Sequence, residues 1–147
     1  GALNIASDFE TRAAQQPTGE MMDILVCGAH LQGQPLNWQL IERGAKLKSA
    51  CTTSENYRLF ALTDGKRPAL VRDSTNGQKI DVEVWQVPAA TVGSFLNGIA
   101  APLGLGKVEL ASGEWVAGFI CDGYGLEGAK DITEYGSWRE WLSSANR

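Results

Sequence analysis

Residues 27–33 are the part of this sequence best suited to chemistry, because the chain's only histidine, His30, lies there between two glycines. An imidazole has a pKa near neutrality, so His30 can donate or accept a proton. Gly28 and Gly33 allow the backbone to approach a ligand closely or to adopt a positive φ. Successive amide groups in such a turn can point inward and bind an anion. The segment therefore predicts an anion site with a proton-transferring histidine, unless His30 is only structural.

Two carboxylates on expected strands are the other candidates for a polar site. Glu83 and Glu109 each lie in a strand pattern, where a buried acid would need a cationic partner such as Arg58. Such a pair could bind substrate, or the acids could instead lie on the solvent-facing side of each strand. Tyr57 and Phe119 are candidates either to line the same cavity or to pack in the core. A binding role and a structural role are both open for these residues.

Composition excludes several classes of function. The 147 residues carry a formal net charge of −4 with scattered Lys and Arg, a pattern that argues against nucleic-acid binding. No apolar run approaches the roughly 20 residues of a membrane helix, and residues 1–22 do not resemble a signal peptide. The three cysteines form no CxxC motif. We therefore expect reduced thiols in a cytoplasmic protein, with no metal, no cofactor, no nucleic acid and no membrane partner.

Short elements of both kinds are expected to hold the histidine segment. Residues 24–27 form a continuous apolar run that predicts the buried strand leading into it. Pro35 predicts a helix through residue 41. Further strands are expected at residues 45–50, 57–62, 69–72, 80–85, 107–110 and 114–121, and further helices after Pro88 and after the N-cap Ser137.

Turn signals then indicate how these elements pair. Asn76-Gly77 and Ser112-Gly113 predict two hairpins, and the lysines of residues 45–50 indicate an edge strand. Helices and strands do not alternate regularly, so the class is α+β: a small mixed or antiparallel β-barrel flanked by short helices. Residues 1–22, with a candidate capping box at Ser7 and Glu10, are expected to be a linker or the remnant of a tag. Residues 23–147 form the domain.

Residues 28–40, GAHLQGQPLNWQL, resemble the start of the C-terminal domain of allophanate hydrolase. The likeness continues through YRLFAL at 57–62 and VEVW at 82–85. It also covers APLGLGKVEL at 101–110, GFIC at 118–121 and DIT at 131–133. The resemblance thus spans about residues 23–142, with only loop-length differences, which makes it more specific than any single motif within it.

The resemblance implies a gamma-glutamylcyclotransferase-like fold and a role in urea breakdown. In this family an N-terminal amidase domain hydrolyses allophanate, and the C-terminal domain decarboxylates the released N-carboxycarbamate. The family's acid/base histidine falls on His30, so we expect His30 to be catalytic and the amides of the segment to hold a carboxylate. The residues expected to bind this small anionic substrate are Gly28, Ala29, Leu31, Gly33, Leu36, Tyr57, Arg58, Glu83 and Glu109.

Two other functions stay open. A non-catalytic domain could dimerise or hold an amidase assembly together, with the strand at 45–50 and the helix after Ser137 as interfaces. A gamma-glutamylcyclotransferase would need a glutamate where residues 95–100, FLNGIA, carry none, unless Glu83 or Glu109 substitutes. The chain shows no amidase triad, so the expected partners are an amidase domain, the small anion and a second copy in a homodimer.

Overall fold

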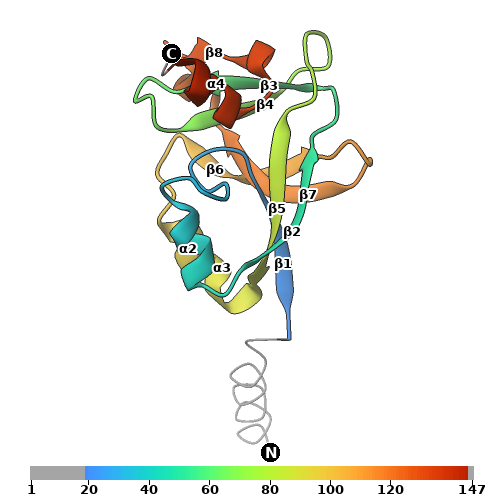
Figure 1. Ribbon diagram of the computed structural model, residues 1–147, viewed down its shortest axis with the longest axis vertical. Coiled ribbons are helices and arrows are strands. Elements are labelled where there is room, and N and C mark those ends of the chain that lie inside the picture. Colours follow the sequence, from blue (N-terminus) through green and yellow to red (C-terminus); the bar gives the residue numbers. More distant parts are fainter. Residues whose placement is uncertain (1–18, 146–147) are drawn as a thin grey trace, which may run out of the picture.

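A computed structural model describes residues 19–145, which form one open five-stranded sheet and a smaller three-stranded sheet (Figure 1). The large sheet has the strand order β2-β5-β1-β7-β6. Its strands are β1 (Met21–Val26), β2 (Lys46–Thr52), β5 (Asp81–Pro88), β6 (Leu103–Glu109) and β7 (Trp115–Cys121). The small sheet has the order β4-β3-β8 and contains β3 (Tyr57–Ala61), β4 (Pro68–Arg72) and β8 (Lys130–Asp131).

Strand β1 is the centre of the large sheet because its apolar run is buried on both faces. It pairs antiparallel with β5 and parallel with β7. Ile24 and Leu25 point to opposite faces, and both are fully buried. β1 therefore ends inside the molecule, where the histidine segment begins.

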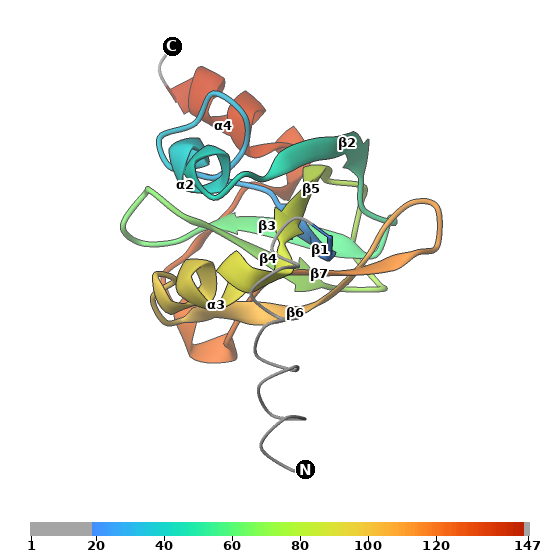
Figure 2. The ribbon, with the colours of Figure 1, turned by 90° about the horizontal axis from the view of Figure 1, so that it is seen from below.

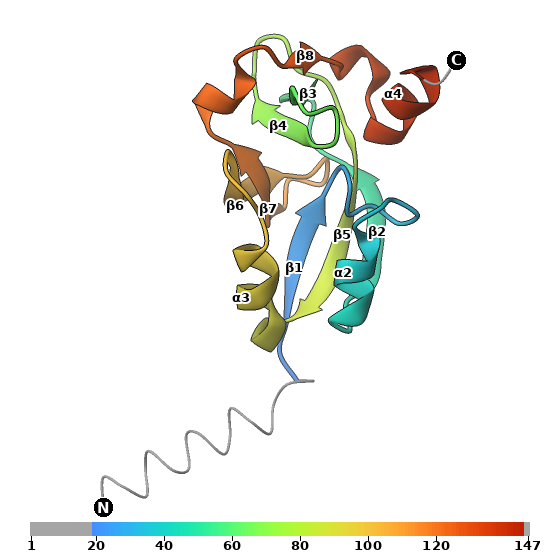
Figure 3. The same ribbon diagram turned by 90° about the vertical axis from the view of Figure 1, so that its left-hand side faces the viewer.

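Two helices cover one face of the large sheet. α2 (Asn37–Glu42) and α3 (Ala89–Asn97) lie on the same side of β1 and β5 (Figures 2 and 3), and Arg43 after α2 donates to Ser94 of α3 at 3.1 Å. The small sheet and α4 (Trp138–Ala145) lie at the end toward which β1 runs (Figure 3). Two 3₁₀ turns, Gly123–Leu126 and Thr133–Tyr135, complete the elements. The C-terminal end of β1 is thus surrounded by the loops of both sheets.

The α+β class is confirmed, but the sheet does not close into the expected barrel. β2 and β6 are the two edge strands of the large sheet, as the lysines of β2 predict, and the two edges meet only at one end, where Thr53 bridges Leu110. The hairpin at Ser112-Gly113 is confirmed, since β6 and β7 pair antiparallel across it. After β2 the chain instead crosses to the end of β6, where the Ser54 amide donates to Glu109 O at 2.9 Å, and continues into the separate small sheet.

The hairpin predicted at Asn76-Gly77 is wrong. A tight turn is present, with the Asp73 carboxylate accepting the amides of Thr75 and Asn76. It nevertheless joins β4 in the small sheet to β5 in the large one, and these two strands do not pair. β5 lies between β1 and β2 in the large sheet, and most of its side chains are buried. Burial of these side chains, rather than the turn, therefore determines which strands pair with β5.

The domain boundary predicted at residue 23 lies close to the start of β1 at Met21. The expected capping box at Ser7 and Glu10 lies outside the described residues. Within residues 19–145, no helix has the length and apolar character needed to cross a membrane.

Candidate functional site

A cavity of about 230 Å³ opens at the C-terminal end of β1, and His30 lines it. This volume lies below the range of roughly 300–1,000 Å³ that accommodates drug-sized ligands. Much of the wall is apolar, and its polar groups come from a few side chains and from main chain. The apolar wall includes Val26, Leu36, Pro68, Ile99 and Phe119, and the polar side chains include His30, Gln39 and Arg67. The site therefore suits a small molecule.

The imidazole of His30 is held in one orientation. Its ring lies 5.1 Å from the ring of Phe95 and 5.9 Å from that of Phe119, measured between centroids. Nε2 lies 2.8 Å from Oε1 of Gln39, and because an amide oxygen only accepts, Nε2 carries the proton. Nδ1 has no hydrogen-bond partner in residues 19–145. Within those residues every fully buried polar side-chain atom has a partner, so Nδ1 is not fully buried. Nδ1 is therefore accessible, on a ring that lines the cavity.

The surroundings of His30 favour its neutral form. Burial lowers the pKa of His30 below its ordinary value, because a charged imidazole loses hydration there. The hydrogen bond with Gln39 opposes this shift, and the positive charge of Arg43 adds to it. In the free protein His30 is accordingly a neutral group whose lone pair is on Nδ1.

The loop of residues 28–33 is closed by local hydrogen bonds. The Leu31 amide donates to Gly28 O at 3.0 Å, and the Leu36 amide donates to Ala29 O at 2.8 Å. Asn37 donates its side-chain amide to His30 O at 2.9 Å. The Leu31 amide was expected to bind the anion, but this turn occupies it, and its side chain is buried in the core.

Other amides of the loop are free to bind a ligand. The N–H groups of Gly28, Ala29 and His30 donate no hydrogen bond within the described part of the chain. All three residues line the cavity. Unpaired amides in an apolar wall are a favourable environment for a carboxylate, because they supply partial positive charge without needing a counterion.

Both glycines of the loop have structural reasons to be glycine. A Cβ on Gly28 would lie 2.3 Å from Cδ and Cγ of Pro68, the first residue of β4. Gly33 has φ +83°, in the left-handed region, and it does not line the cavity. Close packing of β4 against the loop therefore requires Gly28, and the turn before α2 requires Gly33.

Arg67 is a cavity residue that sequence reasoning missed. Its Nε pairs with Oδ2 of Asp64 at 2.8 Å, and its Nη1 donates to the carbonyls of Ala100 and Ala101 at 3.3 and 3.4 Å. The guanidinium thus joins the β3–β4 loop to the segment after α3 across the cavity. Only the pairing of β3 with β4 brings Arg67 here, so no local pattern would have found it.

Glu83 lies behind the loop rather than in the cavity. It is buried, with Oε1 accepting the Gln32 amide at 2.8 Å and the Trp85 indole at 3.0 Å. Its Oε2 pairs with Arg139 on α4 at 3.0 Å. The solvent-facing position considered for Glu83 is wrong. Trp85 could have signalled this, because residues two apart in a strand share a face.

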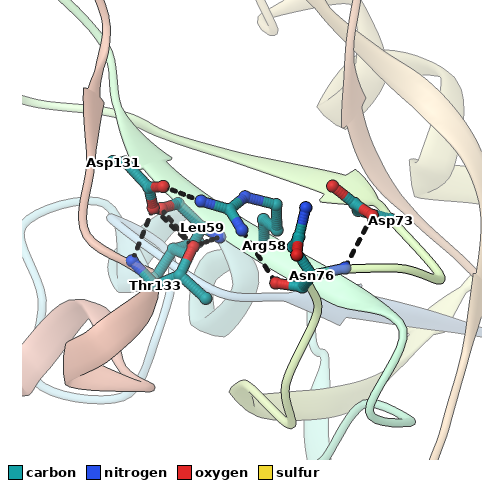
Figure 4. A network of polar contacts seen from close by, with 6 residues as sticks. All are labelled: Arg58, Leu59, Asp73, Asn76, Asp131 and Thr133. Atoms are coloured by element: carbon teal, nitrogen blue, oxygen red, sulfur yellow. Dashed lines mark hydrogen bonds and ion pairs between the residues drawn. The ribbon is translucent and has the colours of Figure 1, made fainter.

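The other predicted polar residues lie away from His30. Arg58 pairs with Asp131 of β8 and donates to Asn76 O at 2.7 Å, so it partners neither glutamate (Figure 4). Glu109 accepts from Arg72 at 3.2 Å. Tyr57 is a core residue whose hydroxyl accepts the Glu109 amide at 2.9 Å. The contacts of Tyr57 and Glu109 join the two sheets, whereas Arg58 pairs within the small sheet. None of these three residues lines the cavity.

No Asp or Glu side chain among the described residues lines the cavity. A cyclotransferase would need Glu83 or Glu109 there, and both are placed elsewhere. Residues 19–145 also contain no group of three or more His, Cys, Asp or Glu side chains arranged to hold a metal ion. The arrangement of His30 beside the unpaired amides is suited to anion binding and proton transfer.

Comparison with known proteins finds similar sequences. A family model described as the allophanate hydrolase C-terminal domain matches residues 22–143. Urea amidolyase of Saccharomyces cerevisiae is 44% identical over 125 residues, which cover 81% of this chain and 7% of that protein. The chain therefore spans only a small part of this relative.

Solved structures give the same result. Kluyveromyces lactis allophanate hydrolase matches with a TM-score of 0.82 and 39% identity, over 86% of this chain and 22% of that one. A uropathogenic E. coli-specific protein matches with a TM-score of 0.80 and 32% identity, over 84% and 97% of the two chains. An AIG2-like mouse protein, at 18% identity and a TM-score of 0.57 over 73% and 83%, shows that the fold is shared.

Proposed function

Because this chain belongs to the family of allophanate hydrolase C-terminal domains, we propose that it decarboxylates N-carboxycarbamate, the product of allophanate hydrolysis, in urea catabolism. The observation that carries the proposal is the position of His30. Its accessible Nδ1 belongs to a ring that lines a small cavity, beside three amides that have no partner in the described chain. A proton donor and an anion site are what this reaction needs from a protein.

The cavity offers two kinds of contact to a dianion. The amides of Gly28, Ala29 and His30 would hold one carboxylate of N-carboxycarbamate by hydrogen bonds. Arg67 would meet a carboxylate from the other wall, giving up its weak contacts to the carbonyls of Ala100 and Ala101. The apolar lining excludes water and strengthens both contacts.

His30 would supply the proton that the reaction consumes. Binding of a dianion favours the charged imidazole, so Nδ1 takes up a proton from solvent. The bond between nitrogen and one carboxylate carbon then breaks, its electron pair stays on nitrogen, and carbon dioxide leaves. The nitrogen accepts the Nδ1 proton, which yields carbamate and returns His30 to its neutral form. Carbamate then takes up a second proton and decomposes to ammonia and carbon dioxide.

The low pKa of His30 suits this role. A histidine that is neutral without substrate transfers its proton readily once charged, because burial makes the cation a stronger acid. Gln39 orients the ring by accepting from Nε2, so the protein leaves Nδ1 for the substrate.

The substrate would come from an amidase, which the relatives named allophanate hydrolase and urea amidolyase suggest as the partner. Cys27, Cys51 and Cys121 are free thiols, which supports a reducing compartment such as the cytoplasm. A small anion and an amidase domain are thus the partners we propose.

The test is carbon dioxide release from N-carboxycarbamate that a separate amidase generates from allophanate in the assay. The unaided rate is subtracted, and the wild-type protein is compared with His30→Gln. We expect the substitution to reduce the remaining rate by ~10²-fold, the contribution of one positioned acid. Arg58→Gln, which lies in the small sheet, serves as the control and should leave the rate unchanged. Equal rates for wild type and His30→Gln would contradict the proposal and leave the non-catalytic scaffolding role.

A further inference from the structure

Gln32 is held from behind through both of its main-chain polar groups. Its amide donates to Oε1 of Glu83 at 2.8 Å, and its carbonyl accepts from Nη2 of Arg139 at 2.6 Å. The same Nη2 also contacts Oε2 of Glu83 at 3.0 Å. These three residues, which we call the loop clamp, connect the loop to β5 and to α4.

The sheet register explains why Glu83 meets the loop. Glu83 lies opposite Val26 in the pairing of β1 with β5, and Val26 is the last residue of β1 before the loop. A side chain at this position is therefore next to the point where the chain leaves the sheet. Arg139 reaches it from the first turn of α4, on which the neighbouring Trp138 is buried in the core.

An ion pair in this environment is a poor source of stability. Burying a carboxylate carries a desolvation cost that its partner only partly offsets, and Arg139 is itself about 42% exposed. Both oxygens of Glu83 are nevertheless engaged, by a main-chain amide, an indole and a guanidinium. Such an arrangement selects one geometry for the groups it contacts.

The local hydrogen bonds that close the loop do not include the amide or the carbonyl of Gln32. Residues 28–33 form neither helix nor strand, and the loop contains two glycines. A binding site on a loop keeps its shape only when surrounding groups hold the backbone. In this loop the unpaired amides belong to residues 28–30, which precede Gln32 and line the cavity. Gln32 lies only two residues from His30, so its position affects the orientation of the His30 amide.

We propose that Glu83 and Arg139 are positioning residues, which hold the loop in its anion-binding conformation through the main chain of Gln32. The proposal rests on the function proposed above, since it assigns these residues to the same anion site. It also makes α4 part of the site's support, although α4 contributes no residue to the cavity wall.

The test uses amide hydrogen exchange and anion binding on Glu83→Gln, Arg139→Ala and the double variant. Malonate is the probe, because it holds two carboxylates as N-carboxycarbamate does, with a methylene in place of the nitrogen. We expect the amides of Leu31, Gln34 and Leu36 to exchange about tenfold faster in each single variant, while those of β1 and β7 are unchanged. The malonate Kd should rise about tenfold, with the double variant no worse than the worse single one.

Glu140→Gln is the matched control, because it removes a negative charge next to Arg139. The Glu140 side chain makes no hydrogen bond within the described chain. Unchanged loop exchange in both single variants would overturn the proposal. So would an equal rise in the loop and in β1, which would indicate general destabilisation. If wild-type protein does not bind malonate, the proposed function fails, whereas faster loop exchange would still establish the clamp.

Discussion

The imidazole of His30 and the side-chain amide of Gln39 are joined by a hydrogen bond of 2.8 Å between Nε2 and Oε1. This contact decides which ring nitrogen remains available, because a neutral imidazole has one donor and one acceptor. Because the protonated Nε2 donates to Gln39, the unprotonated Nδ1 is the nitrogen that can take up a proton. The acid–base chemistry of the site therefore depends on a residue of α2 as well as on the loop.

The lowered pKa of His30 predicts that stability depends on pH. The pKa is lower in the folded state, so the unfolded chain binds more protons below its ordinary pKa of about 6.5. The free energy of unfolding should thus fall as pH drops from 7 to 5, by at most ~1.4 kcal/mol per pH unit, since one proton is involved. Urea unfolding of wild type and His30→Gln would measure this. The same slope in both proteins would contradict the prediction.

Anion binding should raise the pKa of His30. The negative charge of malonate favours the imidazolium, so the binding and protonation of His30 are linked. Because the chain contains one histidine, NMR titration gives a single imidazole signal to follow. Its midpoint should move up with saturating malonate, and the malonate Kd should fall at lower pH. An unchanged midpoint would mean that the anion does not bind beside His30.

Arg67 is expected to contribute to affinity rather than to proton transfer. Arg67→Gln removes the cation from the cavity wall while keeping much of the side chain. The malonate Kd and the KM for N-carboxycarbamate should each rise about tenfold, equivalent to about 1.4 kcal/mol, with kcat less affected. Arg58→Gln breaks an ion pair in the small sheet and is the matched control, with no change in affinity expected. Similar losses in both variants would contradict a direct role for Arg67.

Gly28→Ala tests whether packing against β4 shapes the loop. The added methyl group would overlap the Pro68 ring, whose Cδ and Cγ lie 2.3 Å from the Cβ position. Either the loop or β4 must shift, at an expected cost of about 1–3 kcal/mol in the free energy of unfolding. The control is Gly93→Ala on α3, where nothing lies within 4 Å of the new Cβ and a gain of about 1 kcal/mol is expected. Urea unfolding compares the two, and a stabilised Gly28→Ala would refute this account.

The elements were predictable where a local pattern determines them. The apolar run of β1, the hairpin between β6 and β7, and the cap of α4 by Ser137 depend on residues close in sequence. The failed hairpin at Asn76-Gly77 shows the limit of such reasoning. The turn residues specify a tight turn. Which strands pair with β5 is decided instead by the burial of its side chains in the large sheet, where its neighbours are β1 and β2.

The sequence by itself determined the loop and its histidine, because the turn closes through backbone contacts within a few residues and the segment carries the family likeness. Only the tertiary structure decided the rest of the site. Glu83 contacts Gln32 across 51 residues and Arg139 across 56, and β3–β4 pairing brings Arg67 to the cavity. Such partners are chosen by strand register and core burial, which depend on the whole chain, so no local spacing of residues contains them.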